Sequence, residues 1–413
     1  MKIIHISNSN GRGGAAIATK RLNKALLNQK NDSSIWVNYK YGNNPNIKTY
    51  PNNLLKKINR IKRYLSRALV LLLKTNNPVL HSPQIFSSSY WLKSINESDA
   101  DIIHLHWFQN EMISVSDLSK IKKPLVWTLH DMWGFCGAEH ISYDNRWNEG
   151  YLKSNRPIGE GRIDLNRWTW NRKRKYWKKP INIITPSNWM KQNVKRSYLM
   201  KDWPVYSISN AIDTKKWKSI GKQFSRKTLN LPNELSLILF GSTSGTKDYH
   251  KGFDLLEKSL KKLENTNKKI GLVIFGEDEP EIKPNFKFPI FYLGFLQNSR
   301  SLITAYSAVD LVLIPSRVES FGQVASEANS CSCPVVAFNT SGLGTTVRHK
   351  FSGYLAKAFD TDDFLKGILW VLNNNNLKLK SNCRKHVLDN FESKKIALKH
   401  IELYKKIIND YVN

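Results

Sequence analysis

The chain has 413 residues and a formal net charge of +31, from 64 Lys and Arg against 33 Asp and Glu. So basic a balance predicts an anionic partner, which can be nucleic acid, anionic lipid or a phosphorylated substrate. A hydrophobic content of 41% with 13 Trp excludes a disordered chain, and the length favours two domains. No apolar run approaches the roughly 20 residues of a membrane span, and residues 1–11 lack the apolar core of a signal peptide. We therefore expect a cytoplasmic protein, attached at most to a membrane surface.

The N-terminal segment combines a strand, a glycine turn and a helix. Residues 2–7 form a short apolar run, Gly13 and Gly14 follow it, and helical spacing begins at residue 15. The free N–H groups at a helix start can bind an anion, and glycine lets a ligand approach them closely, so this segment predicts an anion site. The glycine spacing differs from the dinucleotide fingerprint, so we do not expect NAD.

Residues 54–74 have leucine and isoleucine along one helical face and lysine and arginine along the other. A basic amphipathic helix of this kind predicts contact with an anionic bilayer. An ordinary helix packed against its own domain is the alternative, and the pattern leaves both open.

Histidines follow two predicted strands in this half. His104 and His106 lie on one face of the strand at 101–107, and the strand at 124–129 ends at His130. A histidine at the carboxyl end of a strand is well placed to hydrogen-bond a substrate. We do not expect a metal site, because nothing fixes a third and fourth ligand.

Residues 167–180 interleave three Trp and one Tyr with seven basic residues. This composition suits single-stranded nucleic acid, a lipid interface or a phosphorylated glycan. It equally suits a helix whose basic side chains extend along its surface to reach water.

The second half repeats the alternation of strands and helices after a polar segment, residues 215–234, that we interpret as the linker. Its central feature is residues 310–344, with apolar strands at 311–314 and 334–338. Glu319 follows the first strand and leads into a helix that carries Glu327, while Gly342 lies in the turn after the second. Since ligands of parallel sheets bind at the carboxyl ends of strands, this edge is the predicted ligand site.

These motifs together resemble the retaining glycosyltransferases of family 4. The second half carries the matching pieces in the family's order, and the first half is similar to the branch that assembles bacterial surface polysaccharides. The residues that carry the resemblance are Asn210-Ala211-Ile212-Asp213, Lys251-Gly252, Gly276-Glu277-Asp278, the Glu-x7-Glu signature from Glu319 to Glu327, Gly13-Gly14, and His130-Asp131-Met132-Trp133.

The resemblance implies an α/β protein of the GT-B fold, with two doubly wound Rossmann-like domains facing across a cleft. Residues 1–210 would bind the acceptor, residues 211–385 the nucleotide sugar, and the helix in 386–413 would pack back on the first domain. The implied reaction moves a hexose from a UDP- or GDP-sugar to a glycan, in particular a lipid-linked one, with retention and without a metal or other cofactor.

The implied partners are the donor, the glycan acceptor and the anionic inner face of the cell membrane, with nucleic acid not expected. Two alternatives remain open: a non-enzymatic basic protein that binds nucleic acid or membrane, and a sugar-nucleotide epimerase on the same fold.

By the same resemblance, the catalytic set is Glu319 and His130 at the donor sugar and Lys251 at the diphosphate. Glu327 would hold the ribose hydroxyls, because eight helical residues from Glu319 to Glu327 would span roughly 12 Å, about the distance from the sugar to the ribose. The remaining donor-binding residues are Ser320, Phe321, Gly322, Gly13, Gly14, Lys247, Gly276 and Gly342. Ser242 stands where the family usually has a phosphate-binding arginine, and Lys247 is one candidate to replace it.

Overall fold

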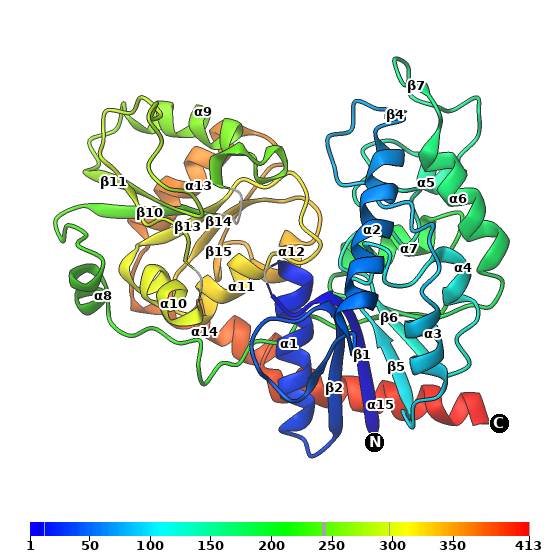
Figure 1. Cartoon of the computed structure of the whole chain (residues 1–413). Helices are drawn as coiled ribbons and strands as arrows, with labels where there is room; N and C mark the ends of the chain where they lie inside the picture. The colour runs from blue at the N-terminus through cyan, green and yellow to red at the C-terminus, as the bar shows by residue number, and fades with distance from the viewer. Residues whose placement is uncertain (12, 242–244, 297, 413) are drawn as a thin grey trace. The chain divides into compact units, whose positions relative to one another are not determined.

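The computed structural model describes residues 1–11, 13–241, 245–296 and 298–412. The chain forms two compact units, which we call the N-terminal unit (Met1–Ile208 with Ile396–Asn413) and the C-terminal unit (Ser209–Lys395). Each unit contains one parallel sheet with helices packed against it (Figure 1). The predicted class, two α/β units with doubly wound sheets, is confirmed.

The N-terminal sheet has the strand order β3-β2-β1-β5-β6-β8-β9, and every pair is parallel. The chain builds outward from β1 to β3, then returns to the other side of β1 with β5. The strands are β1 (Lys2–Ser9), β2 (Asp32–Tyr39), β3 (Ile47–Lys48), β5 (Ile102–Leu105), β6 (Leu125–Thr128), β8 (Asn182–Thr185) and β9 (Val205–Ser207). The topological switch point, where ligands bind in such sheets, therefore lies between β1 and β5.

Eight helices accompany this sheet in the described part of the unit. They are α1 (Gly14–Leu27), α2 (Asn53–Val70), α3 (Ser89–Asn96), α4 (Val115–Leu118), α5 (Arg146–Glu149), α6 (Leu165–Tyr176), α7 (Asn188–Arg196) and α15 (Ser393–Val412). Helix α15, red in Figure 1, belongs to this unit from Ile396 onward. Its Tyr404 hydroxyl lies 2.6 Å from Nδ1 of His104 on β5. A small antiparallel pair, β4 (Leu73–Lys74) with β7 (Gly161–Arg162), lies outside the main sheet.

The C-terminal sheet has the order β12-β11-β10-β13-β14-β15 and is also parallel throughout. Alternate residues of β10 enter different cores: Leu237 and Leu239 face one, Ile238 and Phe240 the other. A strand buried on both faces needs a continuous apolar run, as its sequence provides. The strands are β10 (Ser236–Gly241), β11 (Ile270–Phe275), β12 (Ile290–Tyr292), β13 (Leu311–Ile314), β14 (Val335–Phe338) and β15 (Gly353–Ala356). The switch point of this sheet lies between β10 and β13.

Seven α-helices and two 3₁₀ turns accompany this sheet within the described residues. They are α8 (Lys222–Thr228), η1 (Gly245–Lys247), η2 (Tyr249–Lys251), α9 (Phe253–Leu263), α10 (Ser299–Ala308), α11 (Gln323–Ser330), α12 (Leu343–Thr346), α13 (Thr361–Asn373) and α14 (Leu377–Asn390).

The polar segment 215–234 is not a linker, which corrects the interpretation from sequence. It contains α8, and the buried Arg226 of that helix pairs with Asp310 at 2.9 Å. Both charged groups are buried, and a buried charge without a partner is strongly destabilising. The composition of the segment alone does not reveal this pairing. Sequence analysis also selected no helix at the position of α14, whose hydrophobic periodicity is weak.

The basic and aromatic segment at 167–180 is largely helix α6 with one buried face. Trp170 and Trp177 are buried, and so is Lys173, whose ammonium group donates to the carbonyls of Trp133, Cys136 and Gly137. The packed-helix alternative therefore accounts for most of this segment. In the part of the chain that is described, no helix has both the length and the apolar character needed to cross a bilayer.

Candidate functional site

An ion pair lies at the switch point of the C-terminal sheet. Glu319 is in the loop that follows β13, and Lys251 ends the short turn η2. Nζ of Lys251 lies 2.6 Å from Oε1 of Glu319. The Ser316 hydroxyl donates to the same oxygen at 3.1 Å. Among the described residues, Glu319 Oε2 is therefore the oxygen that remains for a hydroxyl of a ligand.

The turn that carries Lys251 is fixed against the end of β13. Gly252 has φ +67°, and a Cβ atom there would lie 2.1 Å from the Pro315 carbonyl oxygen. No other residue permits so close an approach in this conformation. The matching Lys251-Gly252 motif is thus explained by packing: the glycine brings the lysine beside the loop of Glu319.

Arg317, which sequence analysis did not select, ties the same two segments together. Its backbone N–H donates to the His250 carbonyl at 2.8 Å, and its guanidinium binds Asp254 through two bonds of 2.8 and 2.6 Å. Bidentate arginine–carboxylate pairs fix geometry as well as charge. The sequence signal that could have identified Arg317 is its position two residues before Glu319.

Electrostatics keep Lys251 charged. Burial by itself would lower the pKa of this lysine, but the Glu319 carboxylate offsets burial and raises the pKa above its ordinary value. The lysine side chain retains 29% exposure. The turn therefore presents a permanently charged ammonium group that is held in an ion pair with a carboxylate.

The backbone around Glu319 is held by the turn after β14. The Glu319 N–H donates to the Ser341 hydroxyl at 2.9 Å, and its carbonyl accepts from Gly342 N–H at 2.7 Å. A Cβ at Gly342 would lie 2.4 Å from the Ser320 carbonyl oxygen. Gly342 thus holds the Glu319 loop, and its N–H is already used within the protein.

Helix α11 begins later than the sequence analysis assumed. Glu319 to Gly322 are not helical, and Gly322 precedes Gln323 with φ +86°. The expectation that one continuous helix separates Glu319 from Glu327 is wrong, because Gly322 adopts a left-handed conformation that ends the loop. Glu327 is buried on α11 and its Oε2 accepts a bond of 3.1 Å from the Tyr306 hydroxyl.

The remaining predicted donor-binding residues of this unit differ in position. The Phe321 side chain is buried against Phe391, whereas Ser320 is partly exposed. Gly276 has φ +99° and its N–H donates to the Gly294 carbonyl at 2.8 Å. Lys247 is exposed in η1. Ser242 lies outside the described residues.

The N-terminal unit places its candidates at the carboxyl edge of its own sheet. Gly13 precedes α1 with φ +100°, and Gly14 is the first residue of that helix. His130 follows β6, and its Nε2 lies 3.0 Å from Nδ1 of His106. Both predictions of local structure are confirmed here: a glycine turn at a helix start and a histidine at a strand end.

Partial burial keeps His130 neutral. It lowers the pKa of this histidine to about 4, against the opposing effect of the neighbouring Asp131. The Asp131 carboxylate is itself engaged, since Oδ2 accepts from Trp107 Nε1 at 2.8 Å and lies 2.6 Å from His140 Nδ1. At pH 7 His130 is therefore an uncharged hydrogen-bonding group.

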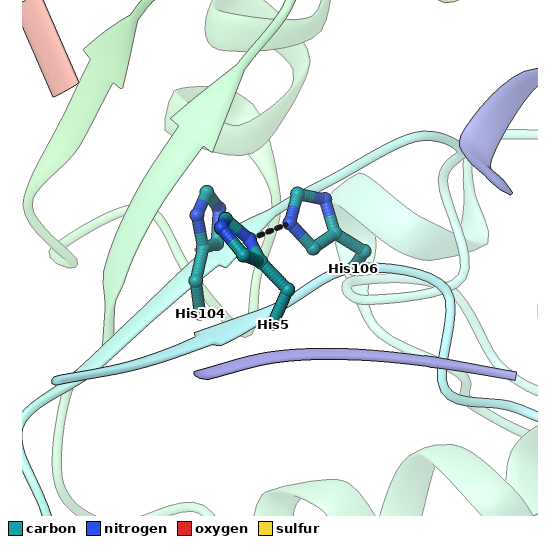
Figure 2. Close-up of side chains that lie close together, drawn as sticks. All are labelled: His5, His104 and His106. Atoms are coloured by element: carbon teal, nitrogen blue, oxygen red, sulfur yellow. Dashed lines mark hydrogen bonds between the residues drawn. The ribbon is translucent and has the colours of Figure 1, made fainter. Parts of the chain in front are cut away.

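Three further histidines lie close together beneath this edge. His5 on β1 stands opposite His104 on β5, and His106 follows two residues later on the same face (Figure 2). One ring nitrogen from each lies within 4.8 Å of the others, and all three side chains are buried. Sequence analysis paired His104 with His106 but missed His5, because only the parallel register of β1 and β5 brings it beside them.

Two family models cover almost the whole chain. The model described as Glycosyltransferase Family 4 matches residues 12–216, and the model described as Glycosyl transferases group 1 matches residues 222–387. The two matches meet near the division between the two units.

Curated relatives match over shorter stretches. An uncharacterised glycosyltransferase of Methanocaldococcus jannaschii is 26% identical over 237 residues, which are 54% of this chain and 59% of that protein. A D-inositol 3-phosphate glycosyltransferase of Saccharomonospora viridis is 41% identical over 75 residues, 18% of this chain and 17% of that protein. The matches thus span less than two thirds of these relatives' lengths.

Solved structures match over the full length. Sucrose-phosphate synthase from Thermosynechococcus elongatus superposes with a TM-score of 0.68 at 17% identity, covering 99% of this chain and 100% of that one. HepE of Anabaena, in complex with UDP and glucose, gives 0.63 at 16% identity, covering 98% and 100%. At these identities the likeness shows the fold, which is GT-B.

Proposed function

Because the chain belongs to the glycosyltransferases of family 4, we propose that it transfers a hexose from a UDP- or GDP-sugar to a glycan acceptor. The observation that carries the proposal is the Lys251–Glu319 pair at the switch point of the C-terminal sheet. A cation for the diphosphate and a carboxylate for the sugar hydroxyls stand side by side there. We assign the nucleotide sugar to the C-terminal unit, because that unit holds this pair.

Lys251 stabilises the negative charge that grows on the leaving diphosphate, and a cation placed before the reaction is effective for this. Glu319 accepts a hydrogen bond from the donor sugar through Oε2, while Oε1 stays with Lys251 and Ser316. Glu327 binds the ribose hydroxyls. His130 contacts the sugar, and the start of α1 at Gly13 and Gly14 binds phosphate or acceptor.

The proposed reaction retains the anomeric configuration. A carboxylate that is paired with a lysine is a poor nucleophile, so Glu319 orients the sugar and does not attack it. The acceptor hydroxyl then approaches the face that the diphosphate leaves, and a diphosphate oxygen takes its proton. Lys251 supplies the positive charge next to that diphosphate, and the proposed transfer proceeds without a metal ion.

The acceptor is proposed to be lipid-linked, because α2 is packed in an unusual way. The residues of α2 that are buried are the polar Asn59 and Ser66. Among its leucine and isoleucine side chains, Leu55 and Leu69 are half-buried and the others are exposed. The exposed apolar residues of α2 and the turn after it are Leu54 (66%), Ile58 (38%), Ile61 (58%), Leu65 (50%), Leu71 (75%) and Leu72 (42%).

This apolar stripe lies beside a face of lysine and arginine, so α2 suits the surface of an anionic membrane. We place the protein there, on the inner face of the cell membrane, where lipid-linked intermediates of surface polysaccharides are extended.

The test begins with binding of UDP, GDP, UDP-glucose and GDP-mannose by thermal shift, followed by mass spectrometry of products with lipid-linked glycan acceptors. We expect donor-dependent stabilisation and a glycosylated product from the wild type, and neither from Glu319→Ala. Lys261→Ala, an exposed lysine on α9, serves as the matched control and should behave as wild type.

Strong binding of RNA without binding of any nucleotide or nucleotide sugar would refute the proposal. If the enzyme released a free epimerised sugar in the absence of an acceptor, the reaction would be epimerisation and not transfer.

A further inference from the structure

Three histidines form a continuous hydrogen-bonded chain from the core of the N-terminal unit to its edge. His5 Nδ1 lies 2.9 Å from His106 Nε2, the bond drawn in Figure 2, and His106 Nδ1 lies 3.0 Å from His130 Nε2. His5 and His106 are buried, while His130 is partly exposed. The rings of His106 and His130 are stacked, with centroids 5.3 Å apart.

Each ring in the chain is neutral, so each carries one N–H. Burial lowers the pKa of His5 to about 3 and that of His130 to about 4, and it places the pKa of His106 well below 6.5. A neutral imidazole donates through one nitrogen and accepts through the other. The two bonds must therefore run in the same direction, either both outward or both inward.

The buried end of the chain selects the direction. His5 Nε2 is buried and has no hydrogen-bond partner among the residues that the structure describes. If the bonds ran inward, this atom would carry an unpaired N–H, which is the rarer kind of unsatisfied group in proteins. If they run outward, it is an unpaired acceptor. Outward bonds place the proton of His5 on Nδ1, that of His106 on Nδ1, and that of His130 on Nδ1.

We propose that His5 and His106 are positioning residues that fix the tautomer of His130, so that His130 presents an Nδ1–H donor to the donor sugar. The proposal deepens the proposed function and rests on it for the identity of the ligand. A hydroxyl oxygen of the sugar accepts this bond, so His130 specifies the orientation of that hydroxyl as well as its position.

His104 supports the chain without joining it. Its ring centroid lies 4.1 Å from that of His106, and its two nitrogens are engaged by the Tyr404 hydroxyl at 2.6 Å and the Thr128 hydroxyl at 2.7 Å. This arrangement disfavours a metal among the three buried histidines. Five of the six ring nitrogens of His5, His104 and His106 already form hydrogen bonds with one another, with His130 or with hydroxyl groups, and His5 Nε2 is the sixth. A metal held by all three rings would therefore have to break bonds of His104 and His106.

The deciding measurement is ¹⁵N NMR of the full chain labelled at histidine, with the His130 signals assigned by their loss in His130→Gln. We expect a protonated Nδ1 and an unprotonated Nε2. In His106→Asn the side-chain amide takes the place of Nδ1 and still donates, so the tautomer should persist. In His106→Asp a carboxylate takes that place and accepts, so the proton of His130 should move to Nε2.

The functional consequence is read from binding of UDP-glucose and GDP-mannose. His106→Asp should weaken binding of the accepted donor by about tenfold, the equivalent of one neutral hydrogen bond, whereas His106→Asn should stay within about threefold of wild type. Thermal unfolding establishes that both variants are folded.

A proton on Nε2 of His130 in the wild type overturns the inference, and so does a stoichiometric metal ion whose removal changes the His106 signals. If the tautomer is as expected but neither nucleotide sugar binds the wild type, the proposed function fails while the directed chain stands.

Discussion

Nζ of Lys251 and Oε1 of Glu319 lie 2.6 Å apart, although 68 residues separate them in sequence. The pair joins the turn before α9 to the loop after β13 across the switch point of the C-terminal sheet. Lysine and glutamate thus hold each other in place before any ligand arrives, which lowers the cost of ordering them when a nucleotide sugar binds.

Replacing Lys251 by alanine should weaken donor binding by about 1.5–3 kcal/mol, the range for a hydrogen bond to a charged group. Isothermal titration calorimetry with the nucleotide sugar measures the change, and Lys261→Ala is the control. The double variant Lys251→Ala/Glu319→Ala should lose less than the sum of the single losses, because the pair acts as a unit. Unchanged affinity in Lys251→Ala would remove this lysine from the site.

Gly252→Ala should destabilise the C-terminal unit by about 2–5 kcal/mol. The left-handed conformation costs about 1–2 kcal/mol for alanine, and the contact with the Pro315 carbonyl oxygen adds the cost of overpacking. Gly221→Ala is the control for a glycine with positive φ, since Gly221 has φ +95° and no atom of the described residues lies within 4 Å of the added Cβ. Equal losses of the free energy of unfolding in urea would show that the Pro315 contact contributes nothing.

Ile61→Glu/Leu65→Glu on α2 should abolish binding to vesicles that contain anionic lipid. Both side chains are at least half exposed, so the free energy of unfolding should change by less than about 1 kcal/mol. Binding of the wild type should weaken as salt rises, because part of the attraction is screened charge. Ile158→Glu alters a fully exposed isoleucine elsewhere and should leave vesicle sedimentation unchanged. Wild-type protein that stays in solution at low salt would contradict the membrane proposal.

Stability should fall as the pH drops from 6.5 towards 4. Burial lowers the pKa of His400 to about 4, so the unfolded chain binds a proton in this window that the folded chain does not. Each such histidine contributes a slope of about 1.4 kcal/mol per pH unit. His400→Leu should therefore reduce the pH dependence of the urea unfolding free energy by about one proton. Leu398→Ala, on the same helix, should leave that slope as in wild type.

Lys173→Met should cost about 3 kcal/mol of unfolding free energy. The ammonium group donates to three carbonyls of the segment after β6, and methionine leaves them buried and unpaired. Because this segment starts at His130, the variant should also reduce donor binding. Lys179→Met changes an exposed lysine just beyond α6 and serves as the control. If Lys173→Met lowered the free energy of unfolding no more than Lys179→Met does, water would have replaced the ammonium group as the donor to these carbonyls.

The sequence by itself was sufficient for most of the architecture. Apolar runs such as residues 311–314 have no plausible place except in a buried parallel strand, and glycines at Gly13 and Gly252 mark backbone conformations that other residues avoid. Hydrophobic period and glycine position are local properties of the chain, so the alternation of strands and helices and the glycine turns could be predicted. Helices α8 and α14 and the non-helical stretch after Glu319 were not predicted.

Contacts between distant segments were decided only by the tertiary structure. From sequence, Arg226 is indistinguishable from a solvated charge, but in the structure it pairs with Asp310. Lys173 resembles a surface lysine in sequence, but it is buried and donates to three carbonyls. His5 is an ordinary strand residue in sequence, and only the pairing of β1 with β5 places it opposite His104. A charged or polar side chain takes its role from the partners that surround it when water is excluded. Those partners come from other strands and helices, and only packing determines which ones they are.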